Sequence, residues 1–400
     1  MANEPASPVP KRPPAGRSPT PRPIFVRGEA AEAQAGPVEG KAMAGSTARA
    51  GRGTVSNSSG RFEKRRLVAM DDGWGNLDEA APRLQTTVQP DKAQSVISRN
   101  DSPDLGFDRS INAYRGCEHG CTYCYARPTH AWLGLSPGLD FESRLFFKPD
   151  AARLLETELA ARHYTCQPIA MGTNTDPYQP IDKKLEITRQ ILDVLERWNH
   201  PVTIVTKSAL ILRDRDILAR MAARNLARVA ISVTTLDRRL ARRMEPRAAT
   251  PERRLEAIRG LAEAGIPTGV ITAPIIPGLT DHETEAILEA GAKAGAAFAS
   301  YVLLRLPLEI KDLFQEWLAT AVPERASRVL ALVRDIRNGS LNSSEFGTRQ
   351  RGQGAYADMI AQRFRLACAR LGLDTSRHAL DTSRFRPPLD RGGQMALFGD

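Results

Sequence analysis

The segment YRGCEHGCTYCY, residues 114–125, carries the most specific information in this 400-residue chain. Three of the five cysteines of the chain lie in it, with C-x3-C-x2-C spacing: Cys117, Cys121 and Cys124. Thiolates are ligands that favour iron–sulfur clusters and zinc. A [4Fe–4S] cluster normally takes four cysteines, so three in one loop would leave one iron free to bind a small molecule. On spacing alone, the alternatives are a zinc site completed by His119 or His130 and buried cysteines that bind no metal.

Short apolar runs alternate with helical periodicity from about residue 105 to residue 310. The expected strands are Ser110–Arg115, Pro168–Gly172, Val202–Thr206, Val229–Thr234, Thr268–Ala273 and Ala299–Leu304. The expected helices between them are Ala151–Arg162, Asp182–Trp198, Arg213–Arg224, Pro251–Ala264 and Asp281–Ala294. This alternation predicts an α/β fold with a parallel sheet, either doubly wound or curled into an incomplete barrel. In both architectures, ligands bind beyond the carboxyl ends of the strands.

The chain on either side of this region has a different character. Residues 1–66 are rich in Pro, Ala, Gly and Ser and predict a disordered basic tail. They hold twelve Lys or Arg residues against five acidic ones, so most of the net charge of +10 lies there. Residues 311–372 predict a helical extension, with Pro323–Arg337 and Tyr356–Leu371 as its clearest helices.

Several protein classes are excluded by composition. Five cysteines are too few and odd in number for a secreted disulfide scaffold. No run of about 18 apolar residues is present, so no membrane-spanning helix is expected. No apolar segment follows the charges near the N-terminus, so we expect no secretory signal and a cytoplasmic protein.

Residues 373–400 predict a flexible tail that contains a short duplication, LDTSR at 373–377 and at 380–384. Near its end, the run Gln394-Met395-Ala396-Leu397-Phe398 resembles the peptide that binds the bacterial sliding clamp. The Gln394 amide would hydrogen-bond the rim of a pocket that Leu397 and Phe398 fill. Such a partner would bring the protein to DNA. The alternative is an apolar terminus that packs against the protein's own surface.

The cysteine motif, with Tyr123 as the aromatic residue before the third cysteine, resembles the signature of the radical S-adenosylmethionine (SAM) superfamily. The resemblance implies an incomplete (β/α)6 TIM-like barrel over residues 105–310, with a [4Fe–4S] cluster on the three cysteines after its first strand. It also implies that the open iron chelates SAM, and that one electron from a donor cleaves SAM to methionine and a 5′-deoxyadenosyl radical. That radical abstracts hydrogen from the substrate, while the protein binds and orients the reactants.

The same resemblance implies where SAM would bind. The candidate cofactor-binding residues are Tyr123, Asn174, Asp176, Ser232, Arg243 and Val270. Asn174 and Asp176 would hold the amino group, although a polar turn is the alternative. Ser232 and Arg243 would bind the ribose hydroxyls and the cofactor carboxylate, and Val270 would line the adenine together with its neighbours Thr272 and Ala273. Lys207 would meet an anionic group, unless it is an ordinary lysine of the rim.

Three further runs resemble the spore photoproduct lyase-like branch of this superfamily: TNTDPYQPID at 173–182, TKSALILRD at 206–214 and RRMEPRAATPERRLEAI at 242–258. Members named for activity reverse a thymine photodimer in DNA, with a cysteine that returns hydrogen. Cys166 and Cys368 are the remaining cysteines and hence the candidate hydrogen donors, although a lone cysteine is more often a core residue. We therefore expect a radical SAM enzyme that acts on DNA, with its lyase or transferase class open. The alternatives are radical SAM modification of RNA or protein, and a non-catalytic, zinc-stabilised, clamp-associated adaptor.

Overall fold

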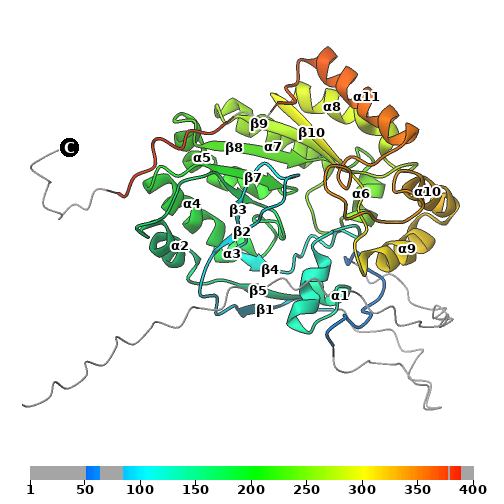
Figure 1. Ribbon diagram of the computed structural model, residues 1–400, viewed down its shortest axis with the longest axis horizontal. Coiled ribbons are helices and arrows are strands. Elements are labelled where there is room, and N and C mark those ends of the chain that lie inside the picture. The colour runs from blue at the N-terminus through cyan, green and yellow to red at the C-terminus, as the bar shows by residue number, and fades with distance from the viewer. Residues whose placement is uncertain (1–50, 64–83, 377–378, 389–400) are drawn as a thin grey trace, which may run out of the picture. The chain divides into compact units, whose positions relative to one another are not determined.

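A seven-stranded sheet forms the centre of the fold in the computed structural model, which describes residues 51–63, 84–376 and 379–388. The strand order is β10-β9-β8-β7-β6-β3-β2 (Figure 1). These strands are β2 (Ile97–Arg99), β3 (Arg109–Ile111), β6 (Ile169–Met171), β7 (Val202–Thr206), β8 (Ala227–Ser232), β9 (Thr268–Ile275) and β10 (Phe298–Leu303). All neighbouring pairs from β3 to β10 are parallel, and β2 is added antiparallel to β3. The six parallel strands confirm the expected incomplete barrel, in which β10 stays an edge strand.

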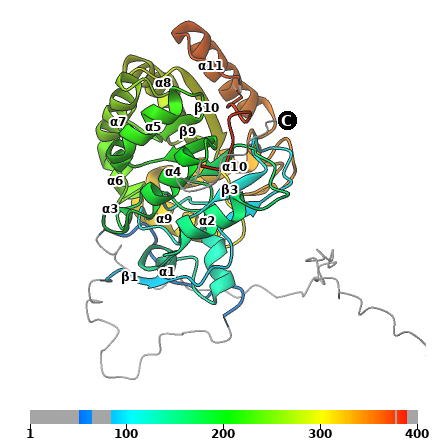
Figure 2. The same cartoon turned by 90° about the vertical axis from the view of Figure 1, so that its left-hand side faces the viewer.

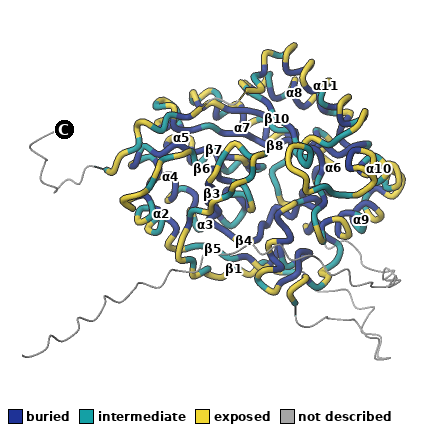
Figure 3. Tube along the Cα trace, viewed as in Figure 1, coloured by how far each residue is buried: buried dark blue, intermediate teal, exposed yellow. Residues whose placement is uncertain are grey.

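Helices connect successive parallel strands and cover the outer face of the sheet (Figures 1 and 2). They are α2 (Ala151–Leu159), α3 (Asp182–Leu185), α4 (Ile187–Arg197), η2 (Ala209–Asp214), α5 (Arg215–Ala222), α6 (Arg238–Met244), α7 (Pro251–Glu263), η3 (Asp281–Glu283) and α8 (Thr284–Lys293). The contact between α8 and the sheet is close, since a Cβ atom on Gly291 would lie 2.8 Å from Cγ1 of Val270. Burial follows this layering, with the strands mostly buried and the outer helices exposed along one side (Figure 3). No helix in the described ranges combines the length and apolar character needed to span a bilayer.

Two expected elements are divided in the structure. The helix expected over 182–198 breaks at Glu186, whose φ of 52° ends α3 and precedes α4. The first expected strand divides into β3 and β4 (Tyr114–Arg115), and β4 belongs to a second, small sheet of order β1-β5-β4. The remaining elements there are β1 (Thr87–Pro90), η1 (Arg127–Leu133), α1 (Leu139–Ser143) and β5 (Arg144–Phe147). Such short strands carry too little periodicity to be recognised in the sequence.

The extension beyond the barrel is helical, as expected. It comprises α9 (Ile310–Ala321), α10 (Pro323–Asp335) and α11 (Ala355–Leu371). Phe314 and Trp317 of α9, with ring centroids 5.4 Å apart, pack in a core that also contains Cys121 and Tyr123 of the cysteine loop. The extension therefore supports the loop directly.

The expectation of a flexible tail from residue 373 is wrong for residues 373–376 and 379–388, which we call the C-terminal strap. The strap crosses the amino ends of the strands, where Asp374 pairs with the backbone at Ala297 and Ala299, and the Asp381 amide donates to the Asn225 carbonyl at 3.0 Å. Each copy of the duplicated LDTSR sequence supplies a buried leucine and an aspartate that accepts a hydrogen bond from the serine amide two residues later. Two short turns with one apolar anchor each leave no helical or strand periodicity, which is why the sequence resembles a flexible tail.

Phe385 is the aromatic anchor of the strap, with ring centroids 6.0 Å from Trp198 and 5.4 Å from both Tyr164 and His200. We predict that Phe385→Ala lowers the free energy of unfolding by about 2 kcal/mol, because this half-buried ring loses three aromatic neighbours. Urea denaturation would measure the change. The control is Arg384→Ala, which removes an exposed ion pair and should change stability by less than about 0.5 kcal/mol. Equal midpoints for wild type and Phe385→Ala would mean that the strap does not stabilise the fold.

Candidate cluster and cofactor site

The cysteine loop follows β4 and lies at the carboxyl ends of the barrel strands. Cys117 and Cys121 are buried and Cys124 is half-buried. Gly116 and Gly120 precede the first two cysteines with φ of 77° and 67°, a conformation that other residues rarely adopt. A Cβ atom on Gly116 would also lie 2.8 Å from the Phe141 carbonyl oxygen. The two glycines therefore let the loop turn tightly enough to bring the thiols together.

A buried carboxylate on α1 anchors the loop from one side. Glu142 is fully buried and forms an ion pair with Arg127, whose Nε donates to the Cys121 carbonyl at 2.9 Å. The same carboxylate accepts hydrogen bonds from the amides of Gly53 and Thr54, at 2.8 and 3.0 Å. The sequence motif gave no indication of Glu142, because it lies 18 residues beyond the last cysteine of the loop.

Residues 51–63 differ from the expected disordered tail, because this segment packs on the cysteine loop. A Cβ atom on Gly53 would lie 1.7 Å from the Gly120 carbonyl oxygen, so only glycine fits there. Arg52 donates to the Glu142 carbonyl at 2.7 Å. Hydrogen bonds to one buried carboxylate hold the segment in place, and apolar burial contributes little. A polar, glycine-rich sequence therefore shows no sign of this order. Residues 1–50 lie outside the described residues.

The surroundings of the loop thiols disfavour free thiolates. Burial raises the pKa of Cys117, and burial together with the negative charge of Glu245 raises the pKa of Cys121 to about 12. Thiolates at these positions therefore need a cationic metal centre.

Both histidines considered as a fourth zinc ligand have other partners. Nδ1 of His119 lies 3.3 Å from a carboxylate oxygen of Asp176. Nε2 of His130 hydrogen-bonds the Arg144 carbonyl at 2.9 Å, and burial lowers the pKa of His130 to about 4. These contacts engage one ring nitrogen of each histidine and fix the orientation of both rings.

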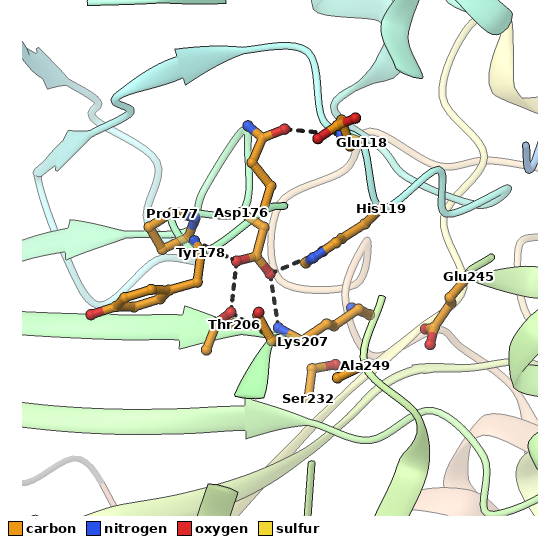
Figure 4. Close-up of polar contacts among 12 residues, drawn as sticks. Glu118, His119, Asp176, Pro177, Tyr178, Thr206, Lys207, Ser232, Glu245 and Ala249 are labelled. Atoms are coloured by element: carbon orange, nitrogen blue, oxygen red, sulfur yellow. Dashed lines mark hydrogen bonds and ion pairs between the residues drawn. The ribbon is translucent and has the colours of Figure 1, made fainter. Parts of the chain in front are cut away.

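Asp176, expected to hold the amino group of SAM, instead joins the cysteine loop to two strand ends (Figure 4). One carboxylate oxygen accepts hydrogen bonds from Thr206 Oγ1 at 2.6 Å and from the Tyr178 amide, and the other accepts from the Lys207 amide at 2.8 Å. Burial alone would raise the pKa of this carboxyl, but His119 and these hydrogen bonds lower it to about 2. With both oxygens engaged, Asp176 acts as a positioning residue. Asn174 is exposed at the same turn and stays a candidate ligand.

A second buried carboxylate, Glu245 after α6, supports Tyr123 of the loop. Glu245 pairs with Arg254 and accepts hydrogen bonds from the Tyr123 hydroxyl and, at 2.7 Å, from Thr234 Oγ1. Burial opposes ionisation of Glu245, yet Arg254 lowers the pKa of this carboxyl to about 2. Nζ of Lys207 lies 5.7 Å from the centroid of the Tyr123 ring. The sequence motif identified Tyr123, but nothing in it indicated that Glu245 and Arg254 hold the ring.

Strand register decides which candidates face the inside of the barrel. Ser232 pairs with Ile271, which pairs with Ser300, so the three side chains share the inner face. Ser232 Oγ donates to the Ala273 carbonyl at 2.9 Å. Ile271 and Ala273 are both half-buried and are better placed than Val270 to contact an adenine.

Two candidate cofactor-binding residues point away from the site. Val270 is fully buried against Gly291 of α8, on the outer face, because side chains alternate along a strand and a shift of one residue reverses the face. Arg243 is exposed on α6 and donates to the Ala321 carbonyl at the end of α9, at 2.9 Å. It therefore supports the extension helix and is not directed at a cofactor carboxylate.

Neither candidate hydrogen donor lies with the cysteine loop. Cys166 precedes β6, at the amino end of the sheet, and Asp381 of the strap is among the groups that act on its pKa. Cys368 is buried in the core contact of α11. Cys368 is therefore a packing residue, whereas Cys166 is half-buried between exposed neighbours.

Comparisons with known proteins agree with this geometry. The family model described as the radical SAM superfamily matches residues 111–291. An uncharacterized protein of Mycobacterium tuberculosis is 37% identical over 232 residues, covering 58% of this chain and 68% of the relative. An uncharacterized protein of Methanocaldococcus jannaschii is 31% identical over 48% of this chain and 69% of the relative. A solved structure of a spore photoproduct lyase mutant, with bound AdoMet and dinucleoside spore photoproduct, has a TM-score of 0.50 to this chain. The match covers 72% of this chain and 80% of the lyase chain at 16% sequence identity, so it shows a likeness in fold.

We predict that Cys124→Ala loses most of its iron after anaerobic reconstitution, because a missing thiolate leaves a second iron of the cluster without a protein ligand. Iron analysis and visible absorption would measure the loss. The matched controls are Cys166→Ala and Cys368→Ala, which should retain iron and SAM cleavage because these thiols lie away from the loop. Wild-type iron content in Cys124→Ala would contradict the assigned ligand set.

Proposed function

Because the chain belongs to the radical SAM superfamily, and so uses a [4Fe–4S] cluster and SAM, we propose that it abstracts a hydrogen atom from a nucleic acid, with DNA as the substrate. The cluster and SAM supply the radical when bound. Cys117, Cys121 and Cys124 would hold the cluster, while Asn174 and Lys207 face the region where SAM would bind. The observation that carries the nucleic-acid substrate is a row of exposed arginines beside the loop.

These arginines lie on α6, which is attached to the cysteine loop. The Thr122 amide donates to the Met244 carbonyl at 3.0 Å, and the Arg247 amide donates to the His119 carbonyl at 3.3 Å. The side chain of Arg247 also pairs with buried Glu118 at 3.1 Å. Backbone and side-chain contacts thus fix the end of α6 against the loop that would hold the cluster.

The arginine row consists of Arg238, Arg239 and Arg242, which are all exposed. None of the three forms an ion pair within residues 51–63, 84–376 and 379–388. Arg238 and Arg242 also line a cavity of about 200 Å³ next to Glu245. Glu245 is paired with Arg254 and Glu252 acts electrostatically on Arg238, so Arg242 leaves an excess of positive charge at this cavity. Arginines that line a cavity suit phosphate oxygens, which receive half or more of the hydrogen bonds in protein–DNA complexes.

The positive charge is local. Outside residues 1–66 the net charge of the chain is close to zero. The arginine row is therefore a local concentration of positive charge on a region that is not basic as a whole. The spore photoproduct lyase structure, which shares the fold, contains a dinucleoside spore photoproduct, and this supports a nucleotide as the substrate. The positions of Cys166 and Cys368 favour a reaction in which no cysteine of this chain returns the hydrogen.

The row predicts a salt-dependent loss of DNA binding. We expect the triple variant Arg238→Ala/Arg239→Ala/Arg242→Ala to bind single-stranded DNA at least about tenfold more weakly, with a salt slope smaller by about 2, since each phosphate contact contributes about 0.7. Fluorescence anisotropy at several salt concentrations would measure both. The matched control removes three exposed arginines elsewhere, Arg215, Arg365 and Arg370, and should change neither value strongly. Equal effects of the two triple variants would mean that the arginine row contributes only nonspecific electrostatic attraction. Tighter binding of RNA of the same sequence would favour RNA modification.

The peptide Gln394–Phe398 lies outside the described residues and stays a prediction. We propose that a peptide spanning residues 391–400 binds the sliding clamp with micromolar affinity, about −8 kcal/mol. Calorimetric titration with purified clamp would measure the affinity, and Leu397→Ala/Phe398→Ala should abolish it because the pocket loses both apolar groups. Arg391→Ala is the control and should bind normally. No heat of binding with the native peptide would remove the clamp as a partner.

A further inference from the structure

Three arginines meet at the carboxyl end of β10 with little negative charge to balance them: Arg305, Arg337 and Arg349. Arg349 pairs with Asp104 and also contacts Ser102. No salt bridge joins Arg305 or Arg337 to a carboxylate within the part of the chain that the structure describes. The cluster therefore has an excess of positive charge.

Arg337 uses most of its donors to support the strand end. Its guanidinium donates to the carbonyls of Leu304 at 2.9 Å and Thr348 at 3.1 Å. Its Nε is buried without a hydrogen-bond partner in the described residues. Burial and the neighbouring Arg305 lower the pKa of Arg337 to about 10. Arg337 is thus a structural residue that adds charge to the site.

Arg305 is the member of the cluster without an assigned partner. It is half-buried, and its Nε is buried and lacks a hydrogen-bond acceptor among the described residues. An unsatisfied buried donor is unfavourable by about 1–3 kcal/mol, more when it is charged. Burial and the charge of Arg349 lower the pKa of Arg305, and they outweigh the opposing effects of Tyr125 and Asp104. An incoming anion would relieve the unsatisfied donor and the repulsion together.

The cluster lies at the same end of the barrel as the cysteine loop. Tyr125, which directly follows Cys124, acts electrostatically on Arg305, and its hydroxyl donates to the Thr173 carbonyl at the end of β6. Asp104, the partner of Arg349, comes from the loop between β2 and β3, the opposite edge of the sheet. The ion pair of Arg349 with Asp104 thus connects the two edges of the sheet. Arg305 lies beside this connection and next to the loop that would hold the cluster.

We propose that Arg305 binds a phosphate group of the nucleic-acid substrate beside the nucleotide that reacts, a site that rests on the proposed function. The guanidinium presents a planar fork of donors that matches phosphate oxygens. SAM also carries an anionic carboxylate. However, Lys207 already supplies a cation near Tyr123, at the end of β7, whereas Arg305 follows β10. Arg305 would thus orient the substrate, while the arginine row of α6 would bind the backbone farther along the strand.

The test is a scan with neutral linkages on the reconstituted full-length protein. The probes are oligonucleotides of about six thymidines in which one phosphate at a time is replaced by an uncharged methylphosphonate. We expect one position to lower wild-type affinity by about tenfold, and the same replacement to have little effect on Arg305→Gln. Arg305→Lys, which keeps the charge and loses the fork, should lie between the two. The α6 triple variant should keep its sensitivity at that position.

The outcomes separate the two proposals. If wild type binds the oligonucleotides and Arg305→Gln responds to every neutral linkage as wild type does, the phosphate site is wrong and the proposed function stands. If Arg305→Gln loses SAM affinity in calorimetry while oligonucleotide affinity stays unchanged, Arg305 serves the cofactor carboxylate instead. If wild type binds no oligonucleotide, the proposed function fails and this site fails with it. Iron content and the urea midpoint of Arg305→Gln should match wild type, because the substitution removes an unsatisfied charge.

Discussion

Pairing of three buried carboxylates with basic side chains is the interaction on which the site depends. The pairs are Glu142 with Arg127, Asp176 with His119, and Glu245 with Arg254. The cysteine loop has little regular secondary structure, so many of its buried backbone groups need partners outside a helix or strand. The three carboxylates and their partners meet that need from α1, from the turn after β6 and from the segment after α6. Removal of one member of the Glu142–Arg127 or Glu245–Arg254 pair would leave its partner as an uncompensated buried charge, which is strongly destabilising.

The carboxylates also explain why distant parts of the chain enclose one loop. Residues 51–63 reach the loop through Glu142, and α9 reaches it through the apolar core around Tyr123. Neither contact belongs to the barrel itself. The barrel supplies strand ends at which polar groups converge, and the additions on either side hold the loop there and shield two of its three thiols from solvent.

The two ends of the sheet have different tasks. At the amino ends, the C-terminal strap adds aromatic packing and backbone hydrogen bonds that stabilise the strands. At the carboxyl ends lie the thiols, Lys207, the arginine row of α6 and Arg305. Chemistry at the carboxyl end and stability at the amino end is the usual division in barrels built from parallel strands. It also accounts for Cys166, a half-buried thiol at the stabilising end that lies away from the cysteine loop.

The cysteine motif, the order of strands and helices and most of their ranges were determined by the sequence itself, because spacing within a loop and periodicity within an element are local properties. Tertiary structure alone decided which way the side chains face and what they meet. Val270 lies one residue out of register with the inner face, and periodicity over so short and buried a strand does not tell one face from the other. Glu142 and Gly53, which are joined by a hydrogen bond, are 89 residues apart in the sequence. The sequence of the C-terminal strap resembles a flexible tail because each of its apolar anchors is a single residue. The free charge of Arg305 likewise follows from which carboxylates the fold places beside other arginines, a property of packing that no local pattern records.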